Sequence, residues 1–304
     1  MKLCIACEQS FGTVSWVCPR CGFAQTKRKG IISFISDTKN EQEELVPLEE
    51  FAVFEERHFW FKRRSQLIIW FLKKYFPLRY NFLEIGCGSG YVSRIIEKEL
   101  SIPEQYGTDI SLTRLDFCRT RTKSVQLFQA DAQGLPFVDE FDVIGIFDVL
   151  EHVDDDRQVL IQAHQALKKR SGAGVIITVP QHPSLFSQHD VMSGHVRRYT
   201  RNEITGKIRH AGFRIERVTS FVSFVLPVLF ISRIFNKKSK AMDIRREFQI
   251  NRFLNFLFSQ VAAIEFLLIR FGINFPFGSS LLIIAKNKSS LKKKVKEKIF
   301  LERN

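Results

Sequence analysis

The sequence predicts an α/β fold built on a doubly wound, parallel sheet. Short apolar segments alternate with longer segments of helical periodicity from residue 81 to residue 179. The first apolar segment runs into three closely spaced glycines, and the next two each end at an aspartate. Ligands bind at the C-terminal ends of such strands, so the glycines and acids together predict one binding site.

Five parallel strands are expected, each too short and too apolar to be an exposed helix. They are residues 81–86, 105–109, 125–130, 141–148 and 174–179, with helices between them.

The turn after the first strand reads FLEIGCGSGY and limits which ligand can bind there. A dinucleotide site needs a small residue at the position of Tyr91, and a triphosphate loop needs a lysine after its last glycine. What remains is Glu84 two residues before Gly86, followed by Gly88 and Gly90. This pattern resembles the S-adenosylmethionine (SAM) site of class I SAM-dependent methyltransferases. In that family the glycines let the backbone approach the methionine part, and Glu84 contacts the turn or the ammonium group.

The resemblance assigns roles to residues at the later strand ends. Asp109 ends the second strand and is expected to bind both ribose hydroxyls. Asp131 would read the adenine amino group, with a backbone contact from Ala132, and the family's next motif begins at Phe147, a further cofactor contact. Each acid alone also fits a helix N-cap, but three acids at successive strand ends after this turn favour SAM.

The resemblance covers about residues 58–286 and implies a Rossmann-like, seven-stranded class I sheet. Its last two strands form an antiparallel pair, expected at Phe213–Thr219 and Ser279–Ala285. The connection between them is far longer than a hairpin loop. Residues 221–278 are therefore expected to contain an apolar helical insert.

Two further motifs resemble a bacterial subfamily (methyltransferase type 11/23-like) that has an H-F-W-F-x-x-R helix and an H-x-R-R-Y loop. That subfamily is associated with envelope-glycan, lipid-linked or quinone-type acceptors. By this resemblance Arg64 would hold the SAM carboxylate, since a guanidinium matches a carboxylate bidentately; the alternative is a solvated helix residue.

Residues 180–199 are expected where an acceptor approaches the methyl group, because they follow the fifth strand. Transfer to a hydroxyl needs alignment and a base, and imidazole is the natural base near neutral pH. The catalytic candidates are His195, His152 and Tyr199, with His182 and His189 as further imidazoles. The neighbouring Arg197 and Arg198 would grip a phosphate or carboxylate of the acceptor, or would lock the loop by salt bridges.

Four cysteines near the N-terminus have the spacing C-x2-C-x10-C-x2-C, and they predict a zinc site. The ligands are Cys4, Cys7, Cys18 and Cys21. Four thiolates leave no open position, so the metal is expected to be structural. The pattern resembles a zinc ribbon over residues 1–35, followed by a linker over residues 36–57; the sequence does not identify a protein partner of the ribbon.

The charge and the apolar insert indicate an anionic partner. The formal net charge is +14 over 304 residues. The insert holds two apolar segments, residues 221–235 and 253–277, but Gln260, Glu265 and Arg270 argue against a membrane span. Lysine and arginine are frequent in two segments, residues 233–246 and the tail, residues 287–304. Apolar helices beside basic segments predict contact with an anionic membrane surface; the alternative is a helical cap on the domain with a solvated tail.

Three functions remain at this point. The first is methyl transfer to an amphiphilic or lipid-linked acceptor by a cytoplasmic enzyme, peripheral at the inner membrane face, because the N-terminus has no secretory signal. The second is RNA base methylation, which the positive charge favours and the lack of an aromatic, basic groove disfavours. The third is a non-catalytic SAM-binding scaffold.

Overall fold

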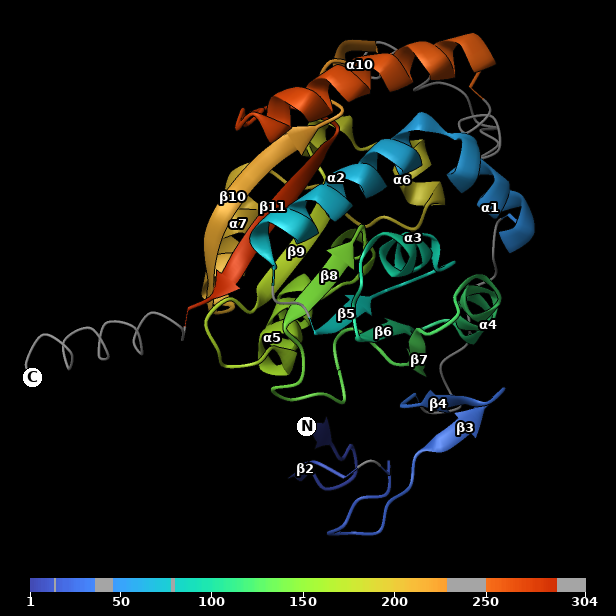
Figure 1. The fold of residues 1–304 in the computed structure, drawn as a ribbon, viewed down its shortest axis with the longest axis vertical. Coiled ribbons are helices and arrows are strands. Elements are labelled where there is room, and N and C mark those ends of the chain that lie inside the picture. Colours follow the sequence, from blue (N-terminus) through green and yellow to red (C-terminus); the bar gives the residue numbers. More distant parts are fainter. Residues whose placement is uncertain (14, 36–45, 78–79, 229–249, 289–304) are drawn as a thin grey trace, which may run out of the picture.

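One mostly parallel sheet organises the computed structural model, which describes residues 1–13, 15–35, 46–77, 80–228 and 250–288 (Figure 1). Its strands, in spatial order, are β10 (Phe213–Phe221), β11 (Ser280–Asn287), β9 (Gly174–Pro180), β8 (Val143–Phe147), β5 (Asn81–Ile85), β6 (Glu104–Asp109), β7 (Gln126–Gln129), β4 (Ile31–Ser33) and β3 (Thr26–Arg28).

The predicted core of the sheet is confirmed. Strands β7, β6, β5, β8 and β9 run parallel, and β11 pairs antiparallel with both β9 and β10. The order reverses beside β5, so the ends of β5 and its neighbours border one crevice.

The sheet has nine strands, whereas seven were expected. Strand β4 pairs in parallel with β7, with Ile32 opposite Phe128, and β3 pairs antiparallel with β4. The two extra strands come from the N-terminal 35 residues. An unpaired edge at β7 would leave backbone groups without partners, and these strands cover it.

Helices cover both faces of the sheet because its strands alternate their apolar side chains. The helices are α1 (Leu48–Arg57), α2 (Phe59–Tyr75), α3 (Tyr91–Glu99), α4 (Leu112–Arg121), α5 (Asp156–Ala166), α6 (Gln188–Met192), α7 (Arg201–His210) and α10 (Arg252–Arg270), with 3-10 turns η1 (Leu150–His152) and η2 (Pro183–Leu185). Phe82 packs with residues of α2, α3 and α10, and the next residue, Leu83, packs with residues of α5 and α7.

The N-terminal residues pack onto the domain. Strands β1 (Lys2–Leu3) and β2 (Ser10–Phe11) pair with each other, and the Leu3 N–H donates to Pro136 O at 2.9 Å. The Trp16 ring lies 4.9 Å from Phe34 and 5.4 Å from Phe128, between ring centroids. Residues 1–35 therefore share a core with the sheet. Residues 48–57, which we assigned to a linker, form α1 because their apolar side chains recur at helical spacing.

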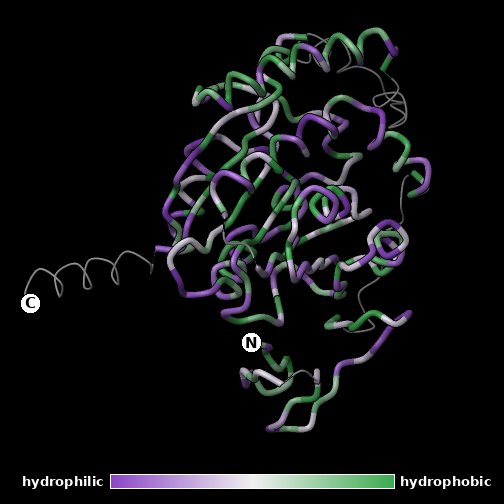
Figure 2. The backbone as a smooth tube through the Cα atoms, in the orientation of Figure 1, coloured by the Kyte–Doolittle hydropathy of each residue, from purple (hydrophilic) through white to green (hydrophobic). Residues whose placement is uncertain are grey.

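The insert contains α10, which Figure 2 shows as a largely hydrophobic helix along one end of the molecule. Asn255 joins it to α2: its Oδ1 accepts from the Phe59 N–H and its amide donates to Arg57 O, both at 2.9 Å. The rest of the first apolar segment (229–235), the basic stretch 233–246 and the tail beyond residue 288 lie outside the described residues.

Candidate functional site

The glycine turn lies between β5 and α3, at the C-terminal edge of the parallel strands. Gly86, Gly88 and Gly90 have φ values of 69°, 53° and 77°, a region that glycine adopts without steric cost. A Cβ on Gly90 would lie 2.5 Å from the Cys118 sulfur, whereas a Cβ on Gly88 would meet nothing within 4 Å. The turn therefore packs tightly at its end and leaves open space at its centre, where a ligand can approach.

Glu84 lies beneath this turn. Its side chain is 2% exposed, and the Ser93 hydroxyl of α3 donates to its carboxyl at 2.5 Å. Burial raises the pKa of Glu84 to about 8. In this structure Glu84 joins strand β5 to helix α3, and its contact with an ammonium group stays a prediction.

The structure brings Asp109 to the glycine turn. One carboxylate oxygen accepts from the Gly88 N–H and the other from the Ser111 N–H, both at 2.9 Å. Asp131 accepts from the Gln133 N–H at 2.9 Å, in an Asx turn beside the half-buried Ala132. Neither acid caps a helix, because Ser111 caps α4 and no described helix follows Asp131 directly. Their contacts with ribose and adenine stay predictions.

Helix α1 covers the glycine turn, a placement that the sequence did not predict. The buried Glu55 accepts from the Ser89 hydroxyl at 2.6 Å and from Arg121 at 2.5 Å. Glu56 also pairs with Arg121, at 3.2 Å. The helical spacing of Leu48, Phe51 and Phe54 was the signal for this helix, although nothing in it indicated what the helix covers.

Arg64 pairs with a carboxylate of the protein, and its contact with the SAM carboxylate stays a prediction. It is buried on α2 and forms an ion pair with Asp148, which also accepts from the Thr178 hydroxyl at 3.0 Å. The Arg64 guanidinium lies 4.6 Å from the Trp60 ring centroid. Asp148 has a φ of 54°, a strained value at the end of β8. Phe147 packs its side chain into the core, so only its backbone is available to a cofactor.

The H-x-R-R-Y loop is locked by internal contacts. Asp190 is fully buried and accepts from Arg198 Nε at 2.7 Å, and the Arg198 guanidinium also donates to Gln181 O at 3.2 Å. Arg197 donates to Asp154 O at 2.9 Å. The arginines thus follow the locking alternative rather than presenting free guanidinium groups to an acceptor.

Tyr199 is fully buried and its hydroxyl lies 2.8 Å from Asp156 and 3.0 Å from Leu150 O. Desolvation and the Asp156 contact raise its pKa far above the ordinary range. This placement makes Tyr199 a positioning residue that joins β9 and α5 through the loops, with no access to a substrate.

His152 and His195 lie together on the loops after β8 and β9. Their ring centroids are 4.7 Å apart. His195 Nδ1 lies 3.0 Å from Asp190 Oδ1, and His152 Nδ1 lies 3.1 Å from Gly194 O. Desolvation by the surrounding protein and the neighbouring His195 lower the pKa of His152 to about 4, although part of the residue is exposed to solvent. Of the other imidazoles, His182 stacks on Phe277, and His189 is the second residue of α6.

Glu151 adjoins the histidine pair. It is fully buried, and burial beside Asp148 raises the pKa of its carboxyl well above the ordinary value. Glu151 O accepts from the Val196 N–H at 2.8 Å, which fixes the two loops against each other. A Cβ on Gly86 would lie 2.5 Å from Val149, so the 148–152 loop also contacts the glycine turn.

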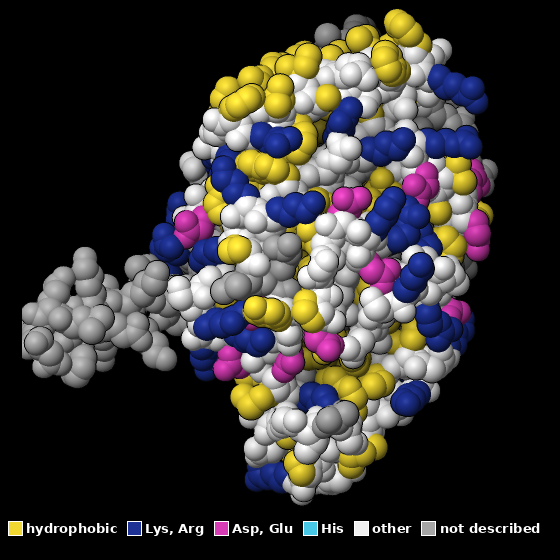
Figure 3. Space-filling model, in the orientation of Figure 1, with side chains coloured by type: hydrophobic (Ala, Val, Ile, Leu, Met, Phe, Trp, Pro, Cys, Tyr) yellow, Lys and Arg dark blue, Asp and Glu magenta, His cyan; other side chains and the backbone are white. Residues whose placement is uncertain are grey.

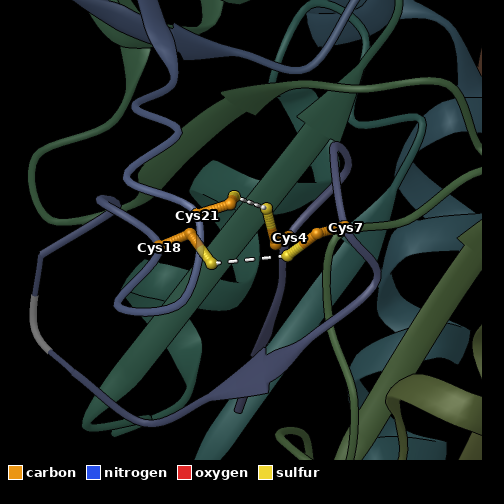
Figure 4. A group of neighbouring side chains, drawn as sticks. All are labelled: Cys4, Cys7, Cys18 and Cys21. Atoms are coloured by element: carbon orange, nitrogen blue, oxygen red, sulfur yellow. Dashed lines mark hydrogen bonds between the residues drawn. The ribbon is translucent and has the colours of Figure 1, made fainter.

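The four N-terminal cysteines converge on one point (Figure 4). The sulfur atoms of Cys4 and Cys21 are 3.6 Å apart, and those of Cys7 and Cys18 are 3.7 Å apart. Zinc–sulfur bonds of about 2.3 Å in a tetrahedron require separations of roughly 3.8 Å. Cys4 and Cys7 lie on one tight turn, closed by Glu8 N–H to Cys4 O, and Cys18 and Cys21 lie on another, closed by Gly22 N–H to Cys18 O, both at 2.9 Å. The residues present therefore fit a tetrahedral metal ion.

A cavity of about 520 Å³ lies between α1 and the start of α10, apart from the glycine turn. Most of its exposed lining area is apolar, from residues such as Val53, Phe54 and Ile250, and the basic residues Arg57 and Arg252 also line it.

Comparisons with known proteins agree with this architecture. Residues 83–174 match the family model described as a methyltransferase domain. A chain from the complex of the Haloferax volcanii Trm112 methyltransferase activator with a methyltransferase has a TM-score of 0.52 at 18% identity, over 79% of this chain and 93% of that chain. A SAM-dependent methyltransferase from Thermotoga maritima has a TM-score of 0.52 at 17% identity, over 79% of this chain and 95% of that chain. No curated protein sequence matches the chain. At these identities the structures show the shared fold.

Proposed function

We propose that this enzyme transfers the methyl group of SAM to a hydroxyl or similar group of an amphiphilic, lipid-linked acceptor, because residues 83–174 match the model of a methyltransferase domain. It would act on the cytoplasmic face of a membrane. The observation that carries the acceptor class is a row of exposed apolar side chains on α10, the helix that packs on α2 beside the site.

The cofactor would bind over the glycine turn. Gly88 leaves open space where the methionine part would bind, Asp109 at the glycine turn would bind the ribose, and Asp131 with Ala132 would border the adenine. Methyl transfer is an in-line displacement, so the enzyme contributes mainly alignment. The loops after β8 and β9 would position the acceptor.

The apolar stripe of α10 is the surface expected to contact lipid. Its members share one side of the helix, at separations of three, four or seven residues, and are 44–78% exposed: Phe253, Phe256, Leu257, Ile264 and Leu267, with Phe271 directly after the helix. Figure 3 shows a row of hydrophobic side chains over α10, with lysine and arginine side chains below it on the same face. Lys62, Lys73 and Lys74 of α2 are exposed cations near this helix. A contiguous apolar surface flanked by cations fits an anionic membrane interface.

The contacts of α10 favour a helix that lies on the membrane rather than crosses it. Among the described residues, α10 is long and apolar enough to span a bilayer. Glu265, however, is 2% exposed and accepts from the Ser223 N–H at 2.9 Å, and Asn255 joins the helix to α2. A helix attached to the domain along one face presents only its other face to lipid.

The cavity between α1 and α10 supports an acceptor with an apolar portion. It opens beside the start of the apolar stripe; its apolar area suits a hydrocarbon chain, and Arg57 and Arg252 suit an anionic group at the end of that chain.

The cysteine cluster is proposed to hold one structural zinc ion. Four thiolates complete a tetrahedron and leave no position for substrate, so the ion would stabilise a segment too small to form its own core.

Methyl-labelled SAM, incubated with the purified enzyme and a lysate of its host, tests the proposal once lipid, RNA and protein fractions are separated. Label in lipid or lipid-linked glycan is the expected result. Label in RNA would replace the acceptor with a nucleic acid. SAM binding without transfer to any fraction would favour a scaffold.

A further inference from the structure

We propose that Glu151, His152 and His195 form a binding site for one divalent transition-metal ion, separate from the cysteine cluster. One donor atom from each residue lies within 4.8 Å of the others. The residues come from two loops, one after β8 and one after β9, which the Val196 N–H to Glu151 O bond fixes against each other. This site does not depend on which acceptor the enzyme uses.

The state of Glu151 is the first reason. Its side chain is fully buried. Beyond its own backbone, neither carboxylate oxygen has a hydrogen-bond partner among the described residues. A buried carboxylate without a donor is costly, and evolution normally supplies a partner or a metal. A bound cation would provide the partner that the carboxylate oxygens of Glu151 otherwise lack.

The orientation of the two imidazoles is the second reason. A metal-binding histidine usually donates its other ring N–H to a carboxylate or a backbone carbonyl. His195 has this contact with the buried Asp190, at 3.0 Å, and His152 has it with Gly194 O, at 3.1 Å. Because a carbonyl or carboxylate oxygen only accepts, Nδ1 carries the proton in each neutral ring. The lone pair of each ring is then on Nε2, available to a metal.

The donor set indicates the kind of ion and its chemistry. Two imidazoles and one carboxylate suit Zn²⁺, Fe²⁺ or Mn²⁺ better than Mg²⁺ or Ca²⁺, which prefer oxygen ligands. Three protein ligands leave a position for a substrate oxygen, and a bound ion would lower the pKa of that oxygen. The loop that carries Glu151 and His152 contacts the glycine turn through Val149, so the ion would bind on a loop that borders the proposed cofactor site.

The experiment counts zinc in the full-length chain. The protein is loaded with Zn²⁺ and desalted, and the ions per chain are counted by native mass spectrometry. Wild type should hold two and Cys18→Ser one. Glu151→Gln, which keeps the side-chain shape, and His195→Gln should each lose one ion while the cysteine site stays filled. His210→Gln changes an exposed histidine at the end of α7 and is the matched control.

Folding is checked by the melting temperature and by SAM binding for each variant. Glu151→Gln could still bind a second zinc ion, but weakly. If a chelator removes that ion at least tenfold more readily than from wild type, the result would also support the site. If wild type and Glu151→Gln hold equal numbers of zinc ions with equal affinity, the inference is wrong, and the histidine pair functions without a metal. The comparison holds even if the cysteine cluster were empty, because only the difference between the two proteins counts.

Discussion

The backbone N–H of Gly88 donates to the carboxylate of Asp109 at 2.9 Å, which joins the ends of the neighbouring strands β5 and β6. The second oxygen of Asp109 accepts from Ser111 at the start of α4. One side chain thus fixes both the glycine turn and the next loop, at the edge of the sheet where the cofactor is expected.

Asp109→Ala should weaken SAM binding by about 10- to 100-fold, because hydrogen bonds to a charged group contribute roughly 1.5–3 kcal/mol. The dissociation constant is measured by isothermal titration calorimetry. Asp116→Ala removes a more exposed acid from α4 and should leave the constant unchanged. Equal affinity in Asp109→Ala and wild type would contradict the ribose assignment.

Replacing Phe256 and Leu267 by glutamate should reduce binding to vesicles that contain anionic lipid by at least tenfold, because the change removes apolar area and adds repulsion. Vesicle co-sedimentation measures the bound fraction. Gln260→Glu adds charge to the same helix face without removing apolar area, so it should lose only the part of the binding that repulsion accounts for and bind better than the double variant. If all these proteins bind vesicles alike, α10 is a cap on the domain.

Glu84→Gln should change how stability depends on pH. The folded-state pKa of Glu84 is raised to about 8, above its unfolded value. Between about pH 5 and pH 8 the native state holds a proton that the unfolded state has lost, so this group makes the wild type less stable as pH rises. The glutamine variant lacks that loss.

The free energy of unfolding of Glu84→Gln, relative to wild type, should therefore increase by about 1 kcal/mol per pH unit across this range. Urea titrations at several pH values measure it. Glu99→Gln, at an exposed position of α3, should show a difference that is constant with pH. A constant difference for Glu84→Gln as well would show that the buried carboxyl is not protonated in the folded state.

Arg198→Ala should destabilise the fold by about 3–5 kcal/mol, because it leaves the fully buried Asp190 without its cation. Arg197→Ala should cost about 1 kcal/mol or less, since Lys207 still pairs with Asp156 at 2.6 Å. Thermal melts compare the two. Similar melting temperatures would argue that Arg198 does not lock the loop and would restore it as a candidate acceptor ligand.

The central strands and the glycine turn were predictable because their signals are local. Apolar runs set the strands, and the steric demands of the turn select glycine at Gly86 and Gly90. The partner of Arg64 was not predictable: the sequence shows an arginine on an amphipathic helix, but only the packed structure brings Asp148 to it.

Contacts between distant segments explain the other differences. Glu55 covers the glycine turn from a segment whose polar beginning resembles a linker. Residues 26–33 are few and rich in lysine and arginine, so no pattern indicated that they would extend the sheet. Both features depend on pairings across many residues, which periodicity does not record.

The parallel pairing of Ser33 with Gln129 has a consequence for how the chain folds. The partner strand is synthesised about a hundred residues later, so β4 cannot dock while the N-terminus is leaving the ribosome. A parallel pair of such high sequence separation forms late, because the chain must lose the entropy of a long loop before the contacts of the pair can stabilise it. The N-terminal segment would meanwhile depend on the zinc ion proposed for the cysteine cluster to stay ordered. Metal supply during synthesis should then influence the yield of folded enzyme more than its stability once folded.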